Sequence, residues 1–84
     1  MSALSAARKS LLDSVQFPPP DFASRKAWIF ERLREVKRGT LKGQEAGFVV
    51  TAILGWADTG PVEERKRFEE WARDIDIARR KLNP

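Results

Sequence analysis

Residues 44–57, QEAGFVVTAILGWA, are the stretch that decides the fold. Within it, Phe48-Val49-Val50-Thr51 has the aromatic and β-branched composition that is typical of strands. No other segment offers itself as a pairing partner, and an unpaired buried strand would leave its backbone amides without hydrogen bonds. We therefore predict a helix over 44–57 that is apolar on nearly all sides and lies at the centre of the fold.

The segment before this stretch has the pattern of a capped amphipathic helix over 21–38. Its apolar residues Phe22, Ile29, Leu33 and Val36 recur at spacings of seven, four and three. Asp21 is a good N-cap, because its carboxylate can accept hydrogen bonds from free amides of the first turn. Gly39 suits the left-handed conformation that often ends a helix.

The segment after it predicts a longer amphipathic helix over 61–82. Pro61 suits the first turn, and an apolar face that includes Phe68 and Ile75 is flanked by opposite charges four residues apart. Ile77 falls opposite that face, and a single exposed apolar residue needs no explanation.

A fourth, shorter helix is predicted at the N-terminus. Leu4, Ala7, Leu11 and Val15 fall on one face at helical spacing over 3–15, and the proline connector at 17–21 stops that helix. The predicted fold is therefore one all-α domain over 1–84, a small compact four-helix arrangement.

Composition excludes several kinds of chemistry. The 84 residues include no His, Cys or Tyr, which rules out disulfides, thiolate and Ser-His nucleophiles, and zinc sites built from the usual ligands. Each acidic pair has a basic neighbour one helical turn away, which indicates a solvated charged face. We expect no catalytic, cofactor-binding or metal-binding residues, and no enzyme.

Charge and hydropathy limit where the protein can be located and which partners it can bind. The longest near-apolar run has twelve residues, whereas a membrane span needs about 20. No apolar segment typical of a signal peptide opens the chain, so we expect a cytoplasmic protein without a membrane partner. Residues 1–43 hold nine basic and four acidic side chains, and residues 44–84 hold seven and eight. An electrostatic partner should therefore meet the first half.

Two candidate binding surfaces lie on opposite flanks of the helix over 21–38. The basic flank offers cations for phosphates and a ring for stacking; its members are Lys26, Phe30, Arg34, Lys37 and Arg38, which Lys42 extends beyond the turn. The other flank sets a tryptophan beside a charged rim, which is typical of interaction hot spots; its members are Trp28, Glu31, Arg32 and Glu35. The alternatives are that Phe30 only widens the core stripe and that the N-terminal helix covers Trp28.

Small residues recur every four positions at Gly43, Gly47, Thr51 and Gly55. A glycine inside a helix costs about 1 kcal/mol, so close packing should offset that cost. Our interpretation is a close-packing ridge under another helix of the same chain. The alternative is a seam between two copies.

These observations predict a small helical protein that acts by binding another protein, as an adaptor, a regulator or an inhibitor, either alone or as a homodimer. The alternative is nucleic-acid binding through the basic flank. Such binding would be non-specific, because the helix over 21–38 carries no Asn or Gln to read base edges.

Overall fold

A computed structural model describes residue 13 and residues 18–82, and it shows three helices in that part of the chain. They are α2 (Phe22–Arg38), α3 (Gln44–Thr59) and α4 (Val62–Leu82). The all-α prediction is confirmed, since residues 18–82 contain no strand. The predicted helix over 3–15 lies outside the described residues except for residue 13, so the structure establishes three of the four predicted helices.

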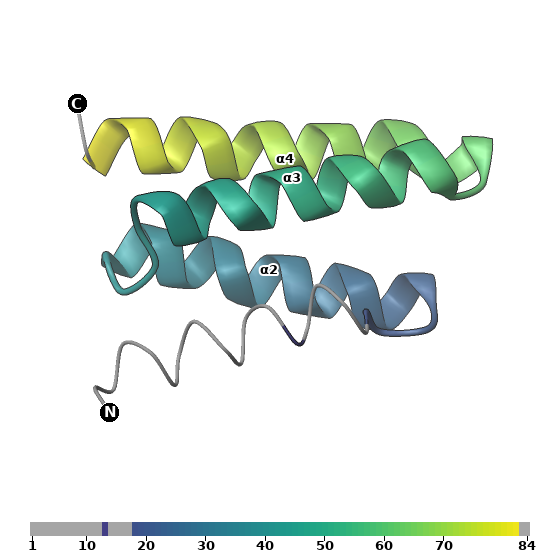
Figure 1. Ribbon diagram of the computed structural model, residues 1–84, viewed down its shortest axis with the longest axis horizontal. Helices are drawn as coiled ribbons and strands as arrows, with labels where there is room; N and C mark the ends of the chain where they lie inside the picture. The colour runs from purple at the N-terminus through teal and green to yellow at the C-terminus, as the bar shows by residue number, and fades with distance from the viewer. Residues whose placement is uncertain (1–12, 14–17, 83–84) are drawn as a thin grey trace.

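The three helices lie side by side, and each runs antiparallel to the next one along the chain (Figure 1). Helix α4 packs closely against both of the others, whereas the backbones of α2 and α3 approach each other less closely. Because α2 and α4 point the same way, their C-terminal ends lie at the same end of the molecule, on the left of Figure 1.

Helix α2 begins and ends where its capping residues place it. The Ser24 amide donates to the Asp21 carboxylate over 2.7 Å, which satisfies one of the free amides of the first turn. At the other end Gly39 has a φ of 82° and donates its amide to the Glu35 and Val36 carbonyls. A residue with a side chain would be strained in that left-handed conformation.

Helix α3 is preceded by a second glycine with a positive φ. Gly43 has a φ of 64°, a backbone conformation that favours glycine, and it forms the turn between α2 and α3. The Gly60 amide donates to the Trp56 carbonyl at the end of α3, and Pro61 then precedes α4. Such a short connection keeps α3 and α4 antiparallel neighbours.

Aromatic side chains from all three helices meet in the core. Phe68 of α4 is fully buried, and its ring centroid lies 5.6 Å from Phe22, 6.1 Å from Trp56 and 5.8 Å from Trp71. These edge-to-face contacts join α2 and α3 to α4.

Helix α3 supplies more of the core than either neighbour, but it is not enclosed on all sides. Six of its residues are buried, among them Val49 and Ile53. Phe48 and Leu54 stay exposed on its other side. Helix α3 is thus apolar on nearly all sides, but the other described helices do not cover all of those sides. Helix α4 is the one that packs closely against both of the others.

Candidate functional site

The flank of α2 that carries Trp28 faces α3. The Trp28 ring is half-buried and meets the Trp56 ring edge to face, with 5.2 Å between centroids. The Arg32 guanidinium lies 5.1 Å from the centroid of the same ring. The Arg32 Nε lies 2.7 Å from a Glu35 carboxylate oxygen, so Arg32 links the indole to that carboxylate. These three residues form one set of intrachain contacts.

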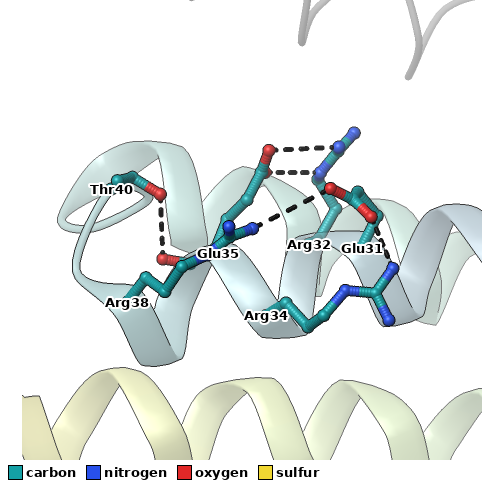
Figure 2. Close-up of polar contacts among 6 residues, drawn as sticks. All are labelled: Glu31, Arg32, Arg34, Glu35, Arg38 and Thr40. Carbon is teal, nitrogen blue, oxygen red and sulfur yellow. Dashed lines mark hydrogen bonds and ion pairs between the residues drawn. The ribbon is translucent and has the colours of Figure 1, made fainter.

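Glu31 pairs with a different set of side chains on α2. Figure 2 shows its carboxylate accepting a hydrogen bond from Arg34, while an Arg38 nitrogen lies 3.9 Å from its other oxygen. The hydrogen bond from Arg34 lowers the pKa of Glu31 below its ordinary value, so this carboxylate stays charged to a lower pH than an unpaired glutamate does. The four residues predicted as one protein-binding surface therefore fall into two sets.

The basic flank is only partly free. Arg34 and Arg38 are exposed, but both are paired with Glu31. The Phe30 ring is half-exposed and meets Trp71 of α4 edge to face, with 5.4 Å between centroids, and the Lys26 ammonium lies 5.6 Å from its centroid. The contact with Trp71 shows that this flank of α2 borders α4.

The remaining lysines of the flank are Lys37 and Lys42. Both are exposed, and neither has an ion-pair partner among the described residues. The cations of the basic flank therefore fall into two groups. Arg34 and Arg38 already pair with Glu31, whereas Lys37 and Lys42 are available to a partner.

The predicted close-packing ridge is largely uncovered by the helices that the structure describes. Gly43 caps α3 from outside the helix, and Thr51 and Gly55 are exposed. A Cβ built on Gly55 would meet nothing within 4 Å, and one built on Gly47 would meet only the Arg79 side chain at 3.6 Å. Spacing of four residues places these positions on one face, but within the described part of the chain only Gly47 approaches another helix, through the Arg79 side chain of α4.

A groove runs between α2 and α4 near their C-terminal ends. It has a volume of about 350 Å³ and is lined by Leu33, Lys37, Asp74, Ile77, Ala78 and Lys81. All six residues come from the two helices, so the groove has two walls and opens outward. Ile77 is 46% exposed there although it is a large aliphatic side chain.

Three charged side chains surround the apolar floor of this groove. Lys37 and Lys81 are in the last turns of their helices, and Asp74 is nearly two turns before Lys81. All three are exposed, and none has an ion-pair partner among the described residues. The groove therefore presents apolar surface together with charges that are available to a partner.

Sequence reasoning missed this groove because its halves are far apart along the chain. Leu33 is assigned to the core stripe of α2, and Ile77 is a single apolar residue on the wrong side of α4. Their meeting depends on how α2 and α4 dock, which helical periodicity does not specify. The one signal of this groove in the sequence is Ile77, an apolar residue on the polar face of α4.

No three carboxylates within residues 18–82 gather closely enough to hold a metal ion. None of the described helices combines the length and the apolar character that a membrane crossing requires. Comparison of the chain with known protein families, with curated protein sequences and with solved structures gave no match.

Proposed function

We propose that this chain is a non-enzymatic helical domain that works by binding another protein in the groove between α2 and α4. The observation that carries the proposal is Ile77, a large aliphatic side chain that is 46% exposed in a groove floored by Leu33 and Ala78. Apolar surface surrounded by charged residues is typical of protein-binding sites. Roles as an adaptor, a regulator or an inhibitor are all compatible with such binding.

The Trp28 flank supports the proposal less well than the groove does. Its indole packs on Trp56, and Arg32 and Glu35 already contact each other. A partner that used this flank would have to compete with these intrachain contacts. A partner in the groove would displace no ion pair among the described residues.

Non-specific nucleic-acid binding is the second candidate, because Lys26, Phe30 and Lys37 share one flank of α2. Glu31 weighs against it. Its carboxylate pairs with Arg34 and Arg38 and places a negative charge among the cations. A phosphate backbone would meet that charge.

Affinity capture from an extract of the native cells, repeated after nuclease treatment, tests the proposal. Three baits are compared: the full chain, Ile77→Asp, and Leu54→Asp as a matched control with the same 46% exposure on α3. We expect a protein that survives nuclease, is retained by Leu54→Asp and is lost with Ile77→Asp. The proposal is contradicted if the captured material is lost after nuclease treatment, or if Ile77→Asp captures it as well as the full chain does.

A further inference from the structure

The groove also has a charge pattern that selects the kind of partner. Lys37 and Lys81 border it at the end where α2 and α4 stop, and Asp74 borders it toward the middle of α4. The lysines are exposed and unpaired among the described residues, so they are available to anions. The groove therefore has a positive end with two cations and a negative end with one carboxylate.

The shape of the groove favours a helix as the occupant. Two neighbouring helices form its walls, and a third helix can lie in the furrow between them as in helix-in-groove recognition. Asp74 and Lys81 are seven residues apart on α4, which corresponds to about 10 Å along the helix axis. That length accommodates about two turns of a partner helix, or apolar side chains at positions i and i+4.

An extended peptide or a small molecule fits the groove less well. Residues 18–82 contain no strand whose edge could take up an extended peptide. A small-molecule site usually covers about 70–90% of its ligand, whereas the described residues give this groove walls from two helices only.

We propose that the groove binds an acidic amphipathic helix of a partner protein, an inference that rests on the proposed function. Two apolar side chains of that helix lie against Leu33, Ile77 and Ala78. Carboxylates at one end of the helix meet Lys37 and Lys81. A basic residue near its other end meets Asp74 and so fixes the direction in which the helix lies.

A display library of amphipathic helical peptides tests this directly. Each peptide is about 20 residues long and carries apolar positions at i and i+4, with the flanking positions free to be Glu, Gln, Ala or Lys. The full chain is one bait. The others are the double variant Lys37→Glu/Lys81→Glu, the groove variant Ile77→Asp and the α3 control Leu54→Asp. Far-ultraviolet circular dichroism confirms that each bait is folded.

We expect the full chain to enrich peptides with Glu beside the apolar anchors, and Leu54→Asp to enrich the same peptides. The double variant should enrich peptides with Lys at those positions instead. The best acidic peptide should bind the double variant roughly tenfold more weakly or worse, because each rim charge changes from attraction to repulsion.

Other outcomes separate the two proposals. Enrichment that depends on Ile77 but shows no preference for charge overturns the acidic partner and leaves the docking groove standing. Enrichment that Ile77→Asp does not affect, or that Leu54→Asp abolishes, overturns the groove and the acidic partner together. A library from which the full chain enriches no peptide also overturns both.

Discussion

Gly55 shows at the level of one residue how a spacing pattern can point to a contact that the fold does not make. It lies inside α3, is exposed, and has open space where a Cβ would be. With no neighbour to accommodate, the glycine only loosens the helix.

Gly55→Ala should therefore stabilise the protein by about 0.5–1 kcal/mol through helix propensity. Urea unfolding followed by circular dichroism measures the change. Gly39→Ala is the control, since Gly39 has a φ of 82°, and it should destabilise the protein because alanine is strained there. A loss of stability in Gly55→Ala would mean that this face of α3 is covered, as it would be in a homodimer seam.

Asp21 links the stability of α2 to pH. Because its carboxylate accepts the Ser24 amide, the pKa of Asp21 is lowered from 3.8 in the folded protein. A group whose pKa falls on folding contributes stability above its unfolded pKa, and that stability is lost as the pH falls through the folded pKa.

Asp21→Ser keeps a capping oxygen without the titrating charge. We expect the parent to be more stable than Asp21→Ser at neutral pH, and this advantage to shrink as the pH falls from about 5 to about 2. Thermal unfolding of both proteins across that range measures it. An advantage that stays constant over the range shows that the charge of Asp21 does not matter.

At the scale of the elements, the aromatic contacts around Phe68 hold the three helices together. Phe68 is fully buried and touches a ring from each of α2 and α3 and a second ring of α4. Phe68→Ala should cost about 3–5 kcal/mol, which is a large share of the stability of so small a domain.

Ile53→Val, at another fully buried position, should cost only about 0.5–1.5 kcal/mol. Urea unfolding of both variants gives the comparison. Equal losses in the two variants would show that the aromatic cluster has no special role in joining the helices.

Local patterns predicted the helices well because the signals for a helix lie close together in sequence. Asp21 and Gly39 cap α2 as predicted, and 44–57 is helical rather than extended, as part of α3. The packing around each helix was less accessible. Helix α3 was expected at the centre with Gly55 covered, but an apolar helix does not reveal which of its sides finds a partner.

The candidate site was predicted only in part for the same reason. Lys37 was recognised as a surface cation, but its neighbours in the groove, Ile77 and Lys81, belong to a helix that is more than twenty residues away along the chain. The grouping of Arg34 and Arg38 as free cations was also incomplete. Glu31, one turn or two away, faces both of them.

At the scale of the whole molecule, the three described helices form a small scaffold whose charged and apolar surfaces meet in one groove. The first half of the sequence carries the excess of positive charge, and its lysine at position 37 borders the groove together with Lys81. Binding of an acidic partner should consequently weaken as salt screens these charges.

Site-specific photo-crosslinking in the native cells tests the central claim most directly. A photoreactive phenylalanine analogue replaces Ile77 in one version of the full chain and Leu54 in a matched version, since both side chains are 46% exposed. The account predicts a protein adduct from position 77 and none from position 54, with the crosslink mapped by mass spectrometry to an acidic helical segment of the partner. An adduct from position 54 alone, or no adduct from position 77, would contradict it.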